Sequence, residues 1–261
     1  MGRSLPPVVA PRIDAYLDAV DEAVPGFVAG LYITGSIALD DYQLAISDID
    51  AVAVCAGRPD AGQCAALAQV HAGGPKVDVL YATAEDLAAD PRTLSLPCSI
   101  LGDFKPADAF AANPVEWRTL STKAFAVRGG PIDPALVWFD EDALRQWNLT
   151  NLDDYWVGKI SEGQRIRPEF LARWESGLQW VVLGIPRLHH TIVTNDVISK
   201  SAAGSYALEI VDEQWHDVVR AAIALRADQQ ADLPKEPVAM VADAVAVAKW
   251  LIDDAHRLGG G

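Results

Sequence analysis

Gly35-Ser36 is separated by eleven residues from Asp48-Ile49-Asp50, and these two short motifs together indicate the fold expected of this chain. Side chains alternate along an extended strand, so Asp48 and Asp50 share one side while Ile49 points to the core. Two carboxylates at this spacing, about 6–7 Å apart along the strand, can converge on a hard cation such as Mg²⁺. A glycine in the turn lets the backbone approach a ligand closely, and the N–H groups there, with the Ser36 hydroxyl, can hold a phosphate.

The flanking sequence places this stretch between two strands. Residues 27–34 and 49–55 are rich in β-forming side chains, and residues 76–81 predict a third strand. Apolar residues at helical spacing predict helices over residues 13–24 and 61–71. The glycine-serine pair therefore sits in the turn that leaves the first strand, and the two aspartates lie at the start of the second.

A third acid, Asp78, lies between Val77 and Val79 in the third predicted strand. A carboxylate in an otherwise apolar strand is costly to bury alone. Its position is explained if it faces the same groove as the two earlier aspartates. An isolated Asp-x-Asp pair is better interpreted as a solvated strand edge, but the Gly-Ser pair upstream and the acid downstream favour a functional site.

Two domains are predicted, over residues 1–145 and 146–261. Prolines recur between residues 90 and 140, which indicates short helices and loops with one more strand. From about residue 150 the pattern is helical, with apolar repeats over residues 170–188, 209–225 and 238–252. The fold class expected is α+β, with a small mixed sheet and helices followed by an all-helical domain.

The composition excludes some classes of function. The 261 residues carry 21 Lys and Arg against 36 Asp and Glu, a net charge of −15. Sequence-independent binding of DNA or RNA needs many basic side chains, so no nucleic-acid partner is expected. The charge favours a cationic small molecule, although acidity that only keeps the protein soluble is the simpler interpretation.

The cysteines and the apolar segments predict a soluble, cytoplasmic protein. Cys55, Cys64 and Cys98 are odd in number and lack metal-type spacing, which is typical of a reducing compartment. The longest apolar stretch, residues 238–252, is too short to span a membrane. Nothing in the sequence indicates an oligomer, so a monomer is the default expectation.

Two resemblances follow from these residues. Gly-Ser, a short helix, Asp-x-Asp on a strand and an acid on the next strand together resemble the signature of the nucleotidyltransferase superfamily related to DNA polymerase β. The second half, with Leu183-Gly184-Ile185-Pro186-Arg187 and the residues up to about 203, resembles the helical C-terminal domain of the aminoglycoside O-adenylyltransferases that act on streptomycin and spectinomycin. The resemblance extends over most of the chain.

The resemblance implies a nucleotide-binding set. Gly35 and Ser36 would hold phosphate from the turn, and the basic residues at the positions of Arg187 and Lys200 reach the ATP phosphates in that family. The two cations would neutralise a triphosphate and orient its pyrophosphate leaving group. From spacing alone they would be interpreted as solvated helix-end charges.

The resemblance also implies a metal site that holds Mg²⁺, in a two-metal mechanism. Asp48 and Asp50 would be metal ligands. Asp78 would accept the proton of the attacking hydroxyl or act mainly as a ligand, since the family has a glutamate there and Asp78 is one methylene shorter.

For the acceptor, the resemblance points to Trp117 and Glu175. Trp117 resembles an aromatic residue that the antibiotic-modifying relatives place against the drug, and a core tryptophan is the alternative interpretation. Streptomycin-modifying relatives place acids just before the second-domain arginine helix, where this chain has Glu175 and the basic Arg173. Asp153 and Asp154 are further acids that could compensate.

The function implied is transfer of AMP from ATP to a hydroxyl of a small, cationic aminoglycoside or aminocyclitol, with release of pyrophosphate. The alternatives are transfer to another small alcohol, to tRNA or to a protein, and a nucleotide-binding relative without catalysis.

Overall fold

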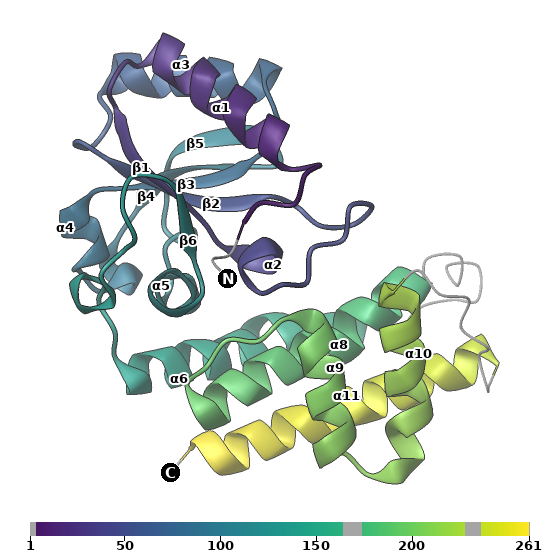
Figure 1. Ribbon diagram of the computed structural model, residues 1–261. Helices are drawn as coiled ribbons and strands as arrows, with labels where there is room; N and C mark the ends of the chain where they lie inside the picture. The colour runs from purple at the N-terminus through teal and green to yellow at the C-terminus, as the bar shows by residue number, and fades with distance from the viewer. Residues whose placement is uncertain (1–3, 164–173, 228–235, 261) are drawn as a thin grey trace. The chain divides into compact units, whose positions relative to one another are not determined.

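The structure, a computed structural model, describes residues 4–163, 174–227 and 236–260. The chain forms two compact units, Met1–Asp140 and Glu141–Gly261. The first unit contains a mixed sheet with helices, and the second is helical (Figure 1). The expected α+β class is confirmed.

The first unit begins with a helix and then alternates strands with short helices. Its elements are α1 (Ala10–Ala23), β1 (Val28–Ile33), α2 (Gly35–Ala38), β2 (Asp50–Cys55), α3 (Ala61–Gly73), β3 (Asp78–Ala82), α4 (Ala84–Leu87), β4 (Leu96–Ile100), β5 (Asp103–Asp108), α5 (Pro114–Thr122) and β6 (Phe125–Arg128), with 3-10 turns at Pro91–Thr93 and Pro134–Leu136.

The described strands form one sheet in the order β5-β4-β3-β2-β1-β6. Strands β2 and β3 pair in parallel, and the other neighbours pair antiparallel. Helices α1 and α3 cover one face, and α4 and α5 lie on the other (Figure 1). Because β2 and β3 run in the same direction, residues at their N-terminal ends come together at one edge.

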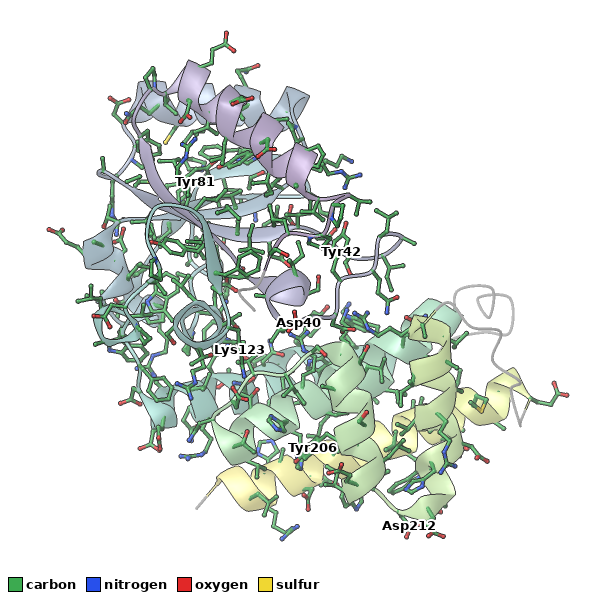
Figure 2. The ribbon with its side chains drawn as sticks, viewed as in Figure 1. Asp40, Tyr42, Tyr81, Lys123, Tyr206 and Asp212 are labelled. Atoms are coloured by element: carbon green, nitrogen blue, oxygen red, sulfur yellow. The ribbon has the colours of Figure 1, made fainter. Side chains whose placement is uncertain are left out.

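A buried polar network fastens the first helical layer to β3. The Tyr81 hydroxyl lies 2.8 Å from the hydroxyl of Tyr16 on α1 and 2.7 Å from Nε2 of His71 on α3. Figure 2 labels Tyr81 on this side of the sheet. Burial lowers the pKa of His71 to about 4, so the ring is neutral at physiological pH. The network fixes the strand that carries Asp78.

The region after residue 82 contains more strand than the sequence predicts. Strands β4, β5 and β6 are all present, although Pro97 lies in β4 and Pro106 in β5. The register of β4 and β5 shifts between Leu96 and Cys98, which accommodates Pro97 in a bulge. Pro106 is tolerated because β5 is an edge strand, where an N–H that faces solvent is not needed for pairing.

The second unit is built around one long helix. Its elements are α6 (Glu141–Asn151), a π-helical segment (Leu152–Trp156), α7 (Val157–Gly163), α8 (Trp174–Thr194), α9 (Lys200–Ile210), a 3-10 turn (Glu213–Trp215), α10 (His216–Arg226) and α11 (Pro237–Gly259). Helix α8 packs against α6, α9, α10 and α11. No helix in the described ranges is long and apolar enough to cross a membrane.

One helix prediction in the second unit is wrong. Residues 209–225 were expected to form a single helix, but α9 ends at Ile210 and α10 begins at His216. Asp212 separates them: its side chain accepts a hydrogen bond from the Gln214 backbone N–H at 3.0 Å and caps a 3-10 turn. Apolar periodicity alone does not detect this break, because the stripe continues across it.

Candidate active site

The turn after β1 is clamped to the first residue of β2. The Thr34 backbone N–H donates to the Asp50 carbonyl at 2.9 Å. Gly35 has a φ of +55°, and a Cβ built there would lie 1.9 Å from Oδ2 of Asp50. Only glycine fits this backbone and this contact, so the Asp50 carboxylate rests directly on the Gly35 backbone.

Ser36 adds an unsatisfied donor to the same turn. Its Oγ is buried and has no hydrogen-bond partner among the described residues. A buried polar atom left without a partner costs about 1–3 kcal/mol. A ligand that reaches this turn would therefore recover a hydrogen bond, as expected for a phosphate-binding turn.

Two of the three acids stand side by side. Asp50 and Asp78 are paired residues of the parallel strands β2 and β3, and the Asp78 backbone N–H donates to the Ile49 carbonyl at 2.8 Å. Asp48 is exposed, Ile49 is buried and Asp50 is partly buried, which is the alternation expected from the sequence. The extended chain thus places Asp48 and Asp50 on the same side.

The Asp78 carboxylate is held by a second contact. Its Oδ1 accepts a hydrogen bond from the Leu101 backbone N–H, in the turn between β4 and β5, at 2.7 Å. Burial raises the pKa of Asp78, the hydrogen bond from Leu101 opposes that rise, and the nearby charge of Asp48 adds to it. The Asp48 charge therefore acts at the Asp78 carboxylate.

These acids provide the donor set that Mg²⁺ prefers, which is carboxylate oxygen. Asp50 and Asp78 are neighbours, and the unpartnered Ser36 hydroxyl lies in the turn against them. Within the described ranges, however, no three His, Cys, Asp or Glu side chains are grouped closely enough to hold a metal ion. The chemistry of the acids fits the cation, and the assignment of Asp48, Asp50 and Asp78 as its ligands stays a prediction.

A fourth acid, Glu116, was not predicted from the sequence. It lies in the first turn of α5 and lines a pocket of about 210 Å³ together with Asp50 and Asp78. Burial raises the pKa of Glu116 to about 7, the charge of Asp50 acts in the same direction, and the Thr34 side chain opposes both. The sequence signals the start of α5 through Asn113 and Pro114, but it carries no sign that this helix meets β2.

Of the residues considered for binding the acceptor, one is buried in the core of the first unit and the others lie on helices of the second unit. Trp117 is fully buried in the core between the sheet and α5, the place that the alternative interpretation gives it. Glu175 lies in the first turn of α8, and its side chain is outside the described part of the structure. Asp153 and Asp154 lie in the π-helical segment, where Asp153 contacts His256 at 2.8 Å.

The two predicted cations of the second unit are brought together. Arg187 on α8 donates from Nε to the Ile198 carbonyl at 3.1 Å, two residues before Lys200 begins α9. The Ser199 hydroxyl accepts from the Ala202 backbone N–H at 3.2 Å and caps that helix. Both cations therefore lie at the junction of α8 and α9.

Buried side chains fix that junction. His189 on α8 lies with Nδ1 2.8 Å from the Tyr206 hydroxyl on α9 and Nε2 3.0 Å from Oδ2 of Asp254 on α11. Figure 2 labels Tyr206 within the helical unit. Because each ring nitrogen of His189 has a partner on a different helix, the three helices are held in one arrangement.

The first unit has a glycine turn clamped to the first of two acid-bearing parallel strands, in a small mixed sheet followed by a helical unit. This is the arrangement that the resemblance to the nucleotidyltransferases related to DNA polymerase β implies. Residues 167–249 match the family model described as "Aminoglycoside adenylyltransferase, C-terminal domain". The match covers the helical half of the chain, where the sequence resembles the same family, and that resemblance is therefore confirmed for this half.

A solved structure supports the same fold. The spectinomycin adenyltransferase AAD(9) from Enterococcus faecialis, crystallised with ATP and spectinomycin, aligns with a TM-score of 0.61 and 11% sequence identity. The alignment covers 92% of this chain and 99% of that one. At this identity the likeness is one of fold. No curated protein sequence matches the chain.

Proposed function

We propose that this protein transfers AMP from ATP to a hydroxyl of a small, cationic aminoglycoside or aminocyclitol and releases pyrophosphate. One observation carries the proposal: Asp50 and Asp78 lie side by side on parallel strands, with the Asp50 carboxylate against the Gly35 backbone. The family match of the helical half, and a structural neighbour crystallised with ATP and spectinomycin, support the choice of nucleotide and acceptor.

In the proposed mechanism the acids hold the cation and handle the proton. Asp48, Asp50 and Asp78 would hold Mg²⁺, which when bound supplies charge neutralisation at the phosphates. The Gly35-Ser36 turn would hold phosphate through backbone N–H groups and the free Ser36 hydroxyl. Asp78, already oriented by Leu101, would accept the proton of the acceptor hydroxyl as its oxygen attacks the α-phosphorus in line.

The helical unit would supply residues that bind the nucleotide and the acceptor. Arg187 and Lys200, held together at one helix junction, would neutralise the phosphates and stabilise the departing pyrophosphate. Glu175 would act on the acceptor side. The net charge of −15 favours a cationic acceptor over tRNA, and the three free cysteines favour a cytoplasmic location and no disulfide partner.

The test is pyrophosphate release from Mg-ATP with a panel of acceptors that includes spectinomycin, streptomycin and simple aminocyclitols. Release is expected with at least one of them, and EDTA should stop it. Binding of Mg-ATP without release on the whole panel would contradict the proposal and favour a non-catalytic nucleotide-binding protein. Labelled AMP on tRNA or on a protein would instead assign a macromolecular acceptor.

Asp78→Asn is expected to leave weak activity. A general base contributes about 10²–10⁴-fold, which corresponds to about 3–5 kcal/mol of the barrier. The asparagine keeps an oxygen that can accept from Leu101, so kcat should fall by this factor while the fold is retained. The matched control is Asp78→Glu, which keeps a carboxylate. A wild-type kcat in Asp78→Asn would remove Asp78 from proton transfer and leave it only the contact with Leu101.

A further inference from the structure

The pocket beside the carboxylate pair extends along β4 and under α5. It is lined by Asp50, Asp78, Ser99, Ile100 and Glu116, among others, and its volume is about 210 Å³. Pockets for drug-sized ligands have volumes of about 300–1,000 Å³. This one therefore suits a single small ring rather than a whole antibiotic. We call it the Glu116 pocket.

The Glu116 pocket contains a buried hydroxyl that the described residues leave without a hydrogen-bond partner. The Ser99 side chain is buried at 1% exposure, and its Oγ has no hydrogen-bond partner among the described residues. No ion pair with a basic side chain is found for Glu116 in the described part of the chain, and the charge that acts on it most strongly is the like charge of Asp50. A partly buried carboxylate in this setting is stabilised by a cationic hydrogen-bond donor.

Helix capping does not explain why an acidic side chain at position 116 lines this pocket. Asn113 already caps α5, because its Oδ1 accepts from the backbone N–H groups of Val115 at 3.1 Å and Glu116 at 3.0 Å. An acid in the first turn also interacts favourably with the helix dipole from an exposed position. That interaction does not require the side chain to line a pocket with Asp50 and Asp78, as Glu116 does.

A metal ion is also a poor occupant for this position. In the proposed function Asp48, Asp50 and Asp78 hold the metal ion, so Glu116, which lines the same pocket as Asp50 and Asp78, is not needed as a ligand. An ammonium group needs only one or two oxygen acceptors at hydrogen-bond distance. A single carboxylate beside the proposed metal ligands therefore suits an organic cation.

We propose that the Glu116 pocket receives one amine-bearing ring of the acceptor, with the Glu116 carboxylate binding its ammonium group and the Ser99 hydroxyl binding a ring hydroxyl. This assignment rests on the proposed function. It places the acceptor ring next to Asp78, the residue that would accept its proton. Glu116 then determines specificity, because an acceptor without the amine would leave its carboxylate buried and unpaired.

The experiment compares wild type, Glu116→Gln and Glu85→Gln with spectinomycin and with N-acetylated spectinomycin. Glu85 is the matched control, since it is an exposed acid in the first turn of α4. Glu116→Gln should raise the KM for spectinomycin about 10–100-fold, the range for a lost charge-assisted hydrogen bond. The KM for ATP and kcat should stay within about threefold, and Glu85→Gln should match wild type.

N-acetylated spectinomycin supplies the specific readout. Wild type should bind it poorly, and Glu116→Gln should cause little further loss, because the two changes remove the same interaction. An equal rise in KM for both acceptors, or a fall in kcat with KM unchanged, would overturn the proposal. If Glu116→Gln does not fold, Ser99→Ala is the second variant, with an expected rise in the KM for spectinomycin of about 2–10-fold.

Calorimetry with spectinomycin, in the presence of Mg²⁺ and a non-hydrolysable ATP analogue, separates failure of this assignment from failure of the proposed function. Wild type that binds spectinomycin without transferring AMP would contradict the function, while loss of that binding in Glu116→Gln would still support the pocket. Transfer by wild type with full binding by Glu116→Gln would overturn the pocket alone. Absence of binding and of transfer with every acceptor of the panel would overturn both.

Discussion

Asp48→Asn is expected to reduce AMP transfer by about 10³-fold or more. A bound metal contributes several kcal/mol of transition-state stabilisation, and each factor of ten in rate corresponds to about 1.4 kcal/mol. Asp48 is exposed, so the substitution removes a charged ligand without disturbing the core. The measurement is the initial rate of pyrophosphate release at saturating Mg-ATP and acceptor.

Two controls make this result specific. Asp14→Asn removes the same charge from an exposed position on α1, on the other side of the sheet, and should leave the rate unchanged. The thermal midpoint of Asp48→Asn should equal that of wild type, since surface substitutions change stability by about 0.5 kcal/mol or less. Transfer at the wild-type rate by Asp48→Asn would remove this residue from the metal site.

The part of the site that the sequence predicts is the part that depends on local geometry. The Gly-Ser turn follows β1, Asp48 and Asp50 flank a buried Ile49, and β2 pairs in parallel with β3 so that Asp50 meets Asp78. Each of these follows from strand periodicity and short connections, which are visible in a single segment of sequence.

The remainder of the sheet could not be predicted in the same way. The prolines at 97 and 106 argue against strands when the sequence is considered segment by segment. In the folded chain one is absorbed by a bulge and the other lies on an edge strand, and both facts depend on which strands are neighbours. Position in the sheet, rather than propensity, decided these elements.

Glu116 illustrates the same limit for the site. Beside Trp117, it looks like an ordinary first-turn helix acid, and the tryptophan attracts the functional interpretation. Packing reverses the two roles: Trp117 is buried in the core, whereas Glu116 lines the pocket with Asp50. Which face of α5 meets the sheet is a tertiary property, because Glu116 and Asp50 are far apart in the chain.

Gly35→Ala is expected to lower kcat by at least about 100-fold and to cost about 1–3 kcal/mol of unfolding free energy. The left-handed φ of +55° is unfavourable for alanine, and its Cβ would lie 1.9 Å from Oδ2 of Asp50. The Asp50 carboxylate must therefore move, which displaces a proposed metal ligand and the turn proposed to hold phosphate. Even a 1 Å misplacement of a reacting group can cost about 10²-fold.

Gly57→Ala is the matched control for this prediction. Gly57 lies in the loop between β2 and α3. No atom lies within 4 Å of a Cβ built at this glycine. It should therefore retain wild-type kcat and a wild-type thermal midpoint. The kinetic loss in Gly35→Ala should persist at a temperature where circular dichroism shows that variant fully folded, because the displaced carboxylate is a feature of the native state. Recovery of the rate on cooling would mean that Gly35 acts only through stability, and the contact between the turn and Asp50 would then have no part in catalysis.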